Sequence, residues 1–172
     1  MSKEEIDERA LFRLGSLLSN NKLKLVSAES MTAGFLSSIF ALEVNSGDYF
    51  LGSIVCYDDF MKERLLQVSS SLIKTYTAES PEVTLAMLQG LQIAISHADI
   101  YITITGLAFE SMNIKQFRPI GRVYYGFAYK GGQHIFEKQF KGNAGQIIIA
   151  TCNSIFYDLY AWLQTMKTIR KQ

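Results

Sequence analysis

The chain is poor in cysteine, proline and histidine, with only two residues of each type among 172. Cys56 falls in a strand-like pattern and Cys152 in a helical one, and neither stands at a metal-ligand spacing from a similar residue. Both thiols are therefore expected to be small buried groups of a protein in a reducing compartment. His97 and His134 are far apart in the sequence, so no metal site is predicted.

An excess of charge of one sign is also lacking, because the formal net charge is +1. A nearly neutral chain offers no electrostatic reason to bind nucleic acid or a membrane surface, and neither partner is predicted. No apolar stretch is long enough to span a bilayer, and the charged first nine residues do not resemble a signal peptide. We therefore expect a cytoplasmic protein that folds as one domain over residues 1–172.

Hydrophobic periodicity and turn residues predict an alternation of helices and strands. Helices are expected over residues 4–19, 32–42, 58–68, 80–97 and from 144 to the end, with a short helix or turn at 69–76. Strands are expected over residues 23–26, 49–57, 99–105, 121–130 and 134–141, with a turn at 45–48 and a loop at 107–119. Ser80 and Pro81 are typical of a helix start, and Gly131-Gly132 of a hairpin turn.

This order of elements predicts an α/β fold with three layers, α/β/α, around a mixed and mainly parallel sheet. The first three strands are expected to be parallel, because helices separate them and right-handed crossovers are the rule. Ligands of such sheets bind beyond the carboxyl ends of the strands. The residues expected there are Glu29, Ser30 and Thr32 after the first strand, Tyr57 and Lys62 after the second, and Thr105 and Gly106 after the third.

The stretch around Ser30 has the order strand, small-residue turn and helix, which brings backbone N–H groups and a hydroxyl to the sheet edge. Serine is a poor nucleophile unless a neighbouring base accepts its proton. Lys62 can be that base only when neutral, so its pKa must fall by about three units from roughly 10.4. Burial beside Tyr57, Phe60 and Met61 is the expected cause, and N–H groups near Ser30 are expected to stabilise an oxyanion.

Each of these residues also has a purely structural interpretation. Ser30 or Thr32 can cap the following helix, since both residue types are favoured at that position. Lys62 can be an ordinary solvated lysine of a helix, and Tyr57 an aromatic residue of the core at the end of a strand. The residue types alone leave these alternatives open.

Four motifs resemble those of a known family in the same order along the chain. Residues 28–34, Ala-Glu-Ser-Met-Thr-Ala-Gly, resemble the pattern Ala-Glu-Ser-Cys-Thr-Gly-Gly, and Tyr57 to Lys62 followed by Leu-Gln-Val resembles Tyr-x-x-x-x-Lys followed by Leu-Gly-Val. Residues 98–108 resemble a strand that runs from Ala-Asp to Thr-Gly-Ile-Ala, and residues 118–121 resemble Lys-Pro-Val-Gly. The chain is thereby identified as a divergent standalone member of the family of CinA carboxy-terminal domains, which includes nicotinamide-nucleotide amidases.

The resemblance implies an α/β/α fold and an amidohydrolase that converts nicotinamide mononucleotide into nicotinate mononucleotide and ammonia, without a cofactor or metal. It implies that Ser30 is the nucleophile, that Lys62 is the general base and that Tyr57 supports them. The residues expected at the substrate are Glu29, Thr32, Gly34, Thr105 and Gly106. A small-molecule nucleotide is thus the expected partner, and a homo-oligomer is left open.

The chain also departs from the family pattern at positions expected to contact substrate. Ala33 replaces the first glycine of a Gly-Gly pair, and Phe109-Glu110 replaces the Gly-Pro that follows alanine. Ala144 stands where the family has an arginine, which is a natural partner for a phosphate. Two hypotheses follow, an amidase with altered substrate recognition and a non-catalytic paralogue that binds or assembles. A nucleic-acid-binding module is disfavoured by the neutral charge.

Overall fold

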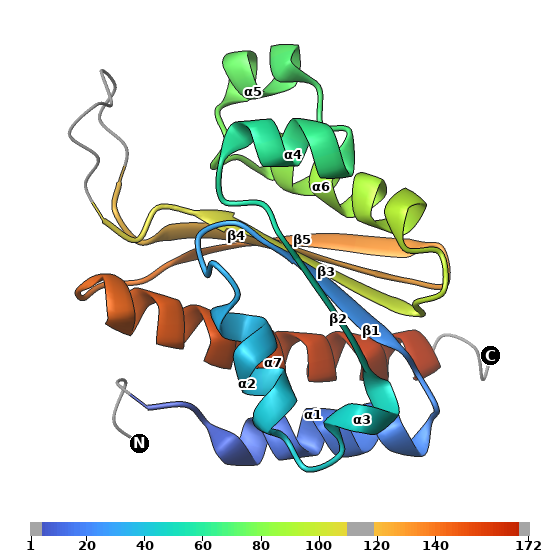
Figure 1. Cartoon of the computed structure of the whole chain (residues 1–172). Coiled ribbons are helices and arrows are strands. Elements are labelled where there is room, and N and C mark those ends of the chain that lie inside the picture. Colours follow the sequence, from blue (N-terminus) through green and yellow to red (C-terminus); the bar gives the residue numbers. More distant parts are fainter. Residues whose placement is uncertain (1–4, 110–118, 169–172) are drawn as a thin grey trace.

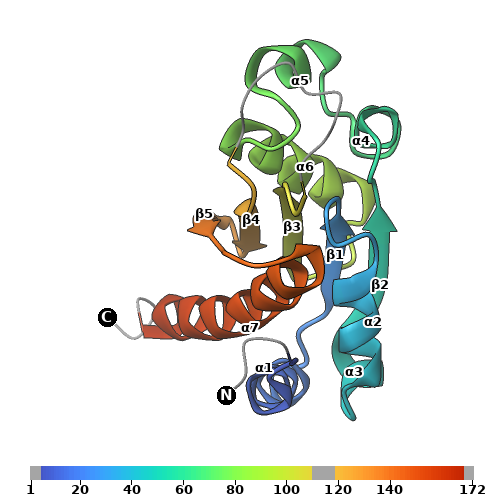
Figure 2. The same cartoon turned by 90° about the vertical axis from the view of Figure 1, so that its left-hand side faces the viewer.

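The computed structural model describes residues 5–109 and 119–168. A five-stranded sheet lies between two helical layers, so the predicted three-layer α/β/α architecture is confirmed (Figure 1 and Figure 2). The strands are β1 Leu25–Glu29, β2 Phe50–Val55, β3 Ile100–Gly106, β4 Arg122–Tyr129 and β5 Gly132–Gln139. One layer holds α4 Asp59–Leu66, α5 Ser70–Tyr76 and α6 Pro81–Ala94. The other holds α1 Glu8–Asn20, α2 Phe35–Leu42, α3 Ser46–Tyr49 and α7 Ala144–Thr168.

The strand order in the sheet is β2-β1-β3-β4-β5. The strand β1 pairs in parallel with both β2 and β3, whereas β4 and β5 are antiparallel to their neighbours. The predicted parallel arrangement of the first three strands is therefore confirmed. Because these strands are parallel, their carboxyl ends lie at one edge of the sheet, and the residues after β1, β2 and β3 lie along that edge.

The strand β1 is displaced along the chain from its predicted position at residues 23–26. It runs from Leu25 to Glu29, and all five of its residues are buried. The prediction ended the strand too early, because Ser27 and Glu29 are polar. Both faces of this strand are covered by helices, so its buried polar groups must find partners inside the protein.

Two further boundaries differ from the prediction. The helix α2 begins at Phe35 rather than at residue 32, because the preceding residues form a turn. The predicted turn at residues 45–48 is largely the short helix α3, which ends at Tyr49. Tyr49 is fully buried and its ring packs edge-on against Phe40, with the ring centroids 6.1 Å apart. This contact takes Tyr49 out of the strand, so β2 is shorter than predicted.

Other local predictions are confirmed. The hydroxyl of Ser80 accepts a hydrogen bond from the N–H of Val83 at 3.2 Å, which caps α6 ahead of Pro81. The predicted hairpin is present, but its turn is Lys130-Gly131, both with positive φ, rather than Gly131-Gly132, because Gly132 begins β5. Two residues with positive φ give the turn the twist that neighbouring antiparallel strands require.

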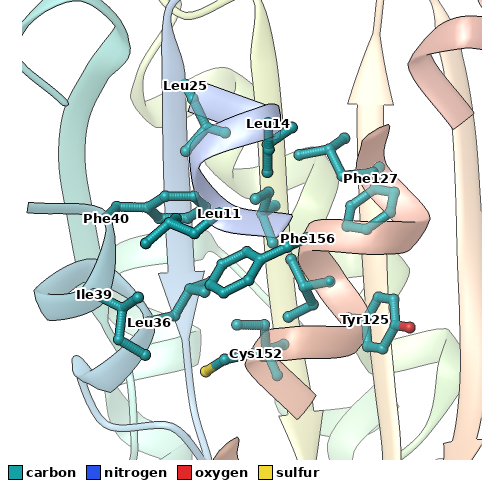
Figure 3. Packing of buried hydrophobic residues seen from close by; sticks show 14 of the residues in the cluster. Leu11, Leu14, Leu25, Leu36, Ile39, Phe40, Tyr125, Phe127, Cys152 and Phe156 are labelled. Carbon is teal, nitrogen blue, oxygen red and sulfur yellow. The ribbon is translucent and has the colours of Figure 1, made fainter. Parts of the chain in front are cut away.

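The core has one cluster on each face of the sheet. The larger cluster joins α1, α2 and α7 to the sheet, and Figure 3 shows Leu14, Phe40, Phe127 and Phe156 converging there. The rings of Phe40 and Phe156 have their centroids 5.6 Å apart. The smaller cluster joins α4, α5 and α6 to the opposite face. No helix within the described residues has the length and apolar character needed to cross a membrane.

Candidate active site

The carboxylate of Glu29 is the most heavily hydrogen-bonded group at the carboxyl edge of the sheet. Glu29 is fully buried at the end of β1 and accepts six hydrogen bonds of 2.7–3.1 Å. The donors are the N–H groups of Gly34, Leu36 and Ser37 and the hydroxyls of Thr32, Ser37 and Ser53. These bonds hold the turn and the first residues of α2 against the end of the strand. A contact between Glu29 or Thr32 and a substrate stays a prediction.

The turn after Ser30 contains two consecutive residues in the left-handed region. Ala33 has φ of 49° and Gly34 has φ of 95°. The left-handed conformation costs an alanine about 1 kcal/mol, whereas a glycine adopts it freely. The residue type of Ala33 does not signal this conformation, whereas the glycine that the family pattern has at this position is consistent with it. This turn is the reason why α2 starts later than predicted.

The nucleophile candidate Ser30 follows β1 directly and is buried. Its N–H donates to the carbonyl of Ile104 in β3 at 3.1 Å, which fixes its backbone between two strands. Its hydroxyl forms no hydrogen bond within the described part of the chain. The N–H groups of Met31 and Thr32 likewise have no acceptor there, whereas the N–H of Ala33 donates to the carbonyl of Ser30 at 3.0 Å. The turn thus leaves a hydroxyl and two backbone donors available.

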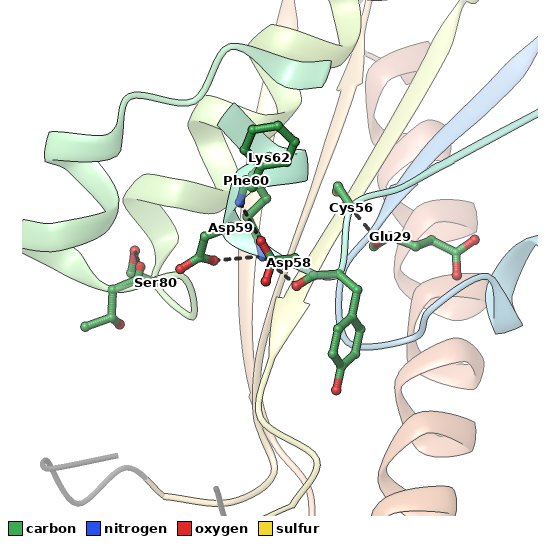
Figure 4. Close-up of polar contacts among 9 residues, drawn as sticks. Glu29, Cys56, Asp58, Asp59, Phe60, Lys62 and Ser80 are labelled. Atoms are coloured by element: carbon green, nitrogen blue, oxygen red, sulfur yellow. Dashed lines mark hydrogen bonds and ion pairs between the residues drawn. The ribbon is translucent and has the colours of Figure 1, made fainter. Parts of the chain in front are cut away.

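The amine of Lys62 lies inside the protein, with the residue only 1% exposed. It donates to the main-chain carbonyl of Tyr57 and to the carboxylate of Asp59, each at 3.1 Å (Figure 4). Lys62 and Leu66 are the two buried residues of α4, one turn apart, on the side that packs against α6. The interpretation of Lys62 as a solvated lysine is therefore wrong. No hydrogen bond joins this amine to Ser30.

The predicted cause of this burial needs correction. The side chain of Phe60 is 65% exposed and that of Tyr57 is 53% exposed, so neither ring covers the amine. Leu66, one turn further along α4, packs into the smaller core cluster with α6, so this side of α4 faces the protein interior. Tyr57 contacts Lys62 through its main-chain carbonyl, and its hydroxyl has no partner among the described residues. Sequence reasoning missed Asp59, which a helical i, i+3 spacing from Lys62 could have signalled.

Cys56 contacts the residue before Ser30 and is also affected by the charge of Lys62. Its N–H donates to the carbonyl of Glu29 at 2.8 Å, and its thiol contacts the same oxygen at 3.6 Å. Burial raises the pKa of the Cys56 thiol to about 11, against the opposing effect of the positive charge of Lys62. Burial also raises the pKa of Cys152 in α7. Both cysteines are buried thiols, as the sequence predicted.

Thr105 in β3 is linked to α6 by a chain of hydroxyls. Its Oγ1 lies 3.0 Å from Oγ1 of Thr84, which donates to the carbonyl of Ser80 at 2.7 Å. Because the Thr84 proton is used in that bond, Thr105 donates to Thr84. Sequence reasoning did not single out Thr84. A substrate contact by Thr105 stays a prediction.

Gly106 ends β3 where the chain packs most tightly. A Cβ atom at this position would lie 2.6 Å from the sulfur of Met31 and 2.9 Å from the carbonyl oxygen of Arg122. Only a residue without a side chain fits between the Ser30 turn and β4. Gly106 therefore positions the turn, whether or not it also contacts a substrate.

A cleft of about 340 Å³ opens at the same edge of the sheet, beside Leu107. It is formed by the start of α6, the residues before it and the start of β4: Tyr76, Thr77, Glu79, Ser80, Pro81, Glu82, Leu107, Pro119, Arg122 and Tyr124. Neither Ser30 nor Lys62 lines it. Ser80 connects the cleft wall to the Thr84–Thr105 hydroxyl pair.

The structure describes three of the departures from the family pattern: Ala33 in the Ser30 turn, Phe109 after β3 and Ala144 at the start of α7. Phe109 is half-exposed, and Ala144 is the first residue of α7, partly buried against the larger core cluster. Glu110 lies outside the described residues. Within residues 5–109 and 119–168, no group of three or more His, Cys, Asp or Glu side chains is placed to hold a metal ion.

The fold and the site define an α/β/α domain with a serine turn and a buried lysine at the carboxyl edge of three parallel strands. The family model of the CinA C-terminal domain matches residues 8–163, and the chain belongs to this family. The resemblance drawn from the motifs is confirmed.

Several known proteins are similar to this chain. A CinA-like protein of Geobacter sp. (strain M21) is 32% identical over 166 residues, covering 96% of this chain and 39% of the relative. A CinA-like protein of Syntrophomonas wolfei is 35% identical over 136 residues, covering 79% of this chain and 32% of the relative. The chain thus spans about two fifths or less of the length of these curated relatives.

Solved structures share the fold. The competence damage-inducible protein A of Klebsiella pneumoniae superposes with a TM-score of 0.87 at 20% identity, covering 93% of this chain and 98% of that structure. A CinA superfamily protein of Enterobacter cloacae superposes with a TM-score of 0.85 at 26% identity, covering 92% of each.

Proposed function

We propose that the chain is a serine–lysine amidohydrolase that acts on the carboxamide of nicotinamide mononucleotide. One observation carries this proposal: two hydrogen bonds connect the Ser30 turn to a fully buried amine. The main-chain carbonyl of Glu29, the residue before Ser30, accepts a hydrogen bond from the N–H of Cys56. The main-chain carbonyl of Tyr57, the residue after Cys56, accepts a hydrogen bond from the Lys62 amine. Nucleophilic amide hydrolysis needs a serine hydroxyl and a base that can reach it, and a buried amine linked in this way to the Ser30 turn supports that pairing.

The reaction proceeds in two balanced steps. Ser30 Oγ attacks the carboxamide carbon and its proton passes to Lys62; the C–N bond then breaks, and the proton leaves with the nitrogen as ammonia. Water attacks the resulting ester and its proton passes to Lys62. The bond between the carbonyl carbon and Ser30 Oγ then breaks, Lys62 returns the proton to Ser30 Oγ, and nicotinate mononucleotide is released. The free N–H groups of Met31 and Thr32 are the candidate donors to the oxyanion.

The contacts of Lys62 set a condition on this mechanism. A base must be neutral and must reach the nucleophile, directly or through one water. The amine is instead held 3.1 Å from the Asp59 carboxylate, which is 51% exposed. Substrate binding must therefore exchange the Asp59 contact for one with Ser30.

The Asp59 ion pair and Ala144 favour the second candidate function, a non-catalytic paralogue that binds a ligand or assembles. In that case the charged Lys62 amine stabilises the fold through its ion pair with Asp59, and the turn around Ser30 serves only to connect β1 to α2. The two functions differ in whether the hydroxyl of Ser30 reacts.

Release of ammonia from nicotinamide mononucleotide tests the proposal. We expect wild type to release ammonia and Ser30→Ala to release none. Lys62→Arg should be folded but inactive, because a guanidinium does not give up its proton. Ser71→Ala and Lys74→Arg, two exposed positions on α5, are the matched controls and should retain activity. Wild type that binds the nucleotide without releasing ammonia would favour the non-catalytic function.

A further inference from the structure

The strand β2 forms one edge of the sheet, with β1 on its inner side (Figure 1). The N–H of Cys56 points toward β1, where it donates to the carbonyl of Glu29. Since backbone groups alternate in direction along a strand, those of Ile54 point inward as well. The N–H and C=O groups of Ser53 and Val55 therefore point away from the sheet. Such a row of unpaired groups is a template for another strand.

The chemistry of β2 differs from that of the opposite edge. Residues 49–57, Tyr-Phe-Leu-Gly-Ser-Ile-Val-Cys-Tyr, contain no charged residue and no proline, which are the usual protections of an edge strand. The other edge strand, β5, carries Glu137 and Lys138, and Glu137 pairs with Arg122 at 3.4 Å. Only the β5 edge is thus protected by charge.

Apolar side chains border the β2 edge. Leu51 is 46% exposed and Val55 is 42% exposed. The helices α2 and α3 lie on the same side of the molecule as the β2 edge (Figure 2). Exposed apolar residues begin, end and follow α2. These residues are Phe35, Leu42 and Val44. An uncharged strand with this apolar border is suited to a buried contact.

We propose that β2 pairs with β2 of a second copy of the chain. Antiparallel pairing about a two-fold axis at Ile54 places Ser53 of each copy opposite Val55 of the other copy. Four backbone hydrogen bonds form, because both residues direct N–H and C=O groups outward. The register shift at Leu51 confines the pairing to the residues after it.

A second copy fits this edge better than an unrelated strand. The register is reciprocal, so each copy offers the same groups that it needs. An uncharged strand meets its own copy without repulsion between like charges. The two-fold contact also closes the assembly and produces one continuous sheet in which both β2 edges are covered.

Sedimentation velocity of the whole chain tests the dimer. Wild type should sediment as a dimer, and Val55→Pro as a folded monomer, because proline removes only the outward N–H. Val55→Lys keeps the backbone N–H, places a charge opposite Ser53 of the other copy on each side of the axis and should also yield a monomer; it decides the matter where Val55→Pro lowers stability. Phe12→Lys, on the exposed side of α1, is the matched control and should remain a dimer. A monomeric wild type, or a dimer that both edge variants retain, would overturn the proposal.

A cysteine at the two-fold axis tests the register. The Cα atoms of two opposed Ile54 residues would lie about 4.5 Å apart, within disulfide range. Ile54→Cys should form a disulfide-linked dimer under mild oxidation, whereas Ile93→Cys, exposed on α6, should not. The native thiols are both buried and do not interfere. Equal cross-linking of the two variants, or none for Ile54→Cys, would rule out the proposed register.

Discussion

Single residues at the carboxyl edge differ in how fully their polar groups are used. The carboxylate of Glu29 has six donors, and Thr105 donates into the chain through Thr84. Ser30, by contrast, has a hydroxyl without a described partner. The satisfied groups supply rigidity, and the unsatisfied one is where a substrate can add an interaction.

Replacement of Ala33 by glycine tests the strain in the turn. Ala33→Gly should stabilise the protein by about 1 kcal/mol, because an exposed alanine with φ of 49° is strained and glycine is not. The measurement is urea unfolding. The same substitution at Ala41, an exposed position in α2, should instead destabilise by roughly 0.5–1 kcal/mol. A lower free energy of unfolding for Ala33→Gly than for wild type would show that Ala33 is not strained in this conformation.

Position 144 tests whether an arginine there would bind the phosphate of the proposed substrate. Ala144→Arg should raise turnover of nicotinamide mononucleotide about tenfold, which is the scale of one charge-assisted hydrogen bond. Nicotinamide riboside is the control substrate, because it lacks the phosphate and should gain nothing. An equal gain on both substrates, or none on the nucleotide, would mean that this position does not recognise phosphate.

At the scale of elements, the sequence predicts the amphipathic helices and the apolar strands, because burial on one face leaves a regular pattern. It fails where polar residues are buried. Glu29 belongs to β1 because the donors of α2 and β2 surround it, and these contacts are distant in sequence. The short helix α3 is not predicted for a similar reason. Its residues have the composition of a turn, and the packing of Tyr49 on Phe40, which stabilises the helix, is a tertiary contact.

The junction of β3, β4 and the Ser30 turn depends on Gly106. Gly106→Ala should destabilise the protein by about 1–3 kcal/mol, because the new Cβ overlaps Met31 and a β4 carbonyl. Gly47→Ala in α3 is the matched control, since nothing lies within 4 Å of a Cβ there. Thermal unfolding separates the two, and equal transition temperatures would disprove the close packing.

The start of α1 is tied to α7 through Asp7. The hydroxyl of Tyr157 donates to its carboxylate and lowers the pKa of Asp7, with the N–H groups of Ala10 and Arg9 also lowering it and burial opposing them. A carboxyl whose pKa is lowered by folding stabilises above its unfolded pKa of about 4, and this contribution is lost as the pH falls through the folded value. Asp7→Asn should therefore be less stable at pH 7, and its stability should vary less with pH below 4. Chemical denaturation at several pH values measures this, and an unchanged pH profile would refute the linkage.

At the scale of the whole molecule, parallel pairing assembles the site from segments that are far apart in sequence. Because strand ends can be recognised locally, the sequence predicts that Ser30, Lys62 and Thr105 follow strands that share one edge. It does not predict which atoms they contact. The contacts of Asp59 with Lys62 and of Thr84 with Thr105 depend on the direction of each side chain, which is set by the packing of α4 and α6.

The central claim is that Ser30 forms an acyl intermediate, and hydroxylamine trapping tests it most directly. Hydroxylamine competes with water for an acylated serine, so wild type with nicotinamide mononucleotide should form the hydroxamate of nicotinate mononucleotide. The hydroxamate, measured by mass spectrometry, should rise with hydroxylamine concentration and be absent with Ser30→Ala. Ammonia release that continues in Ser30→Ala, or proceeds in wild type without any hydroxamate, would contradict the account.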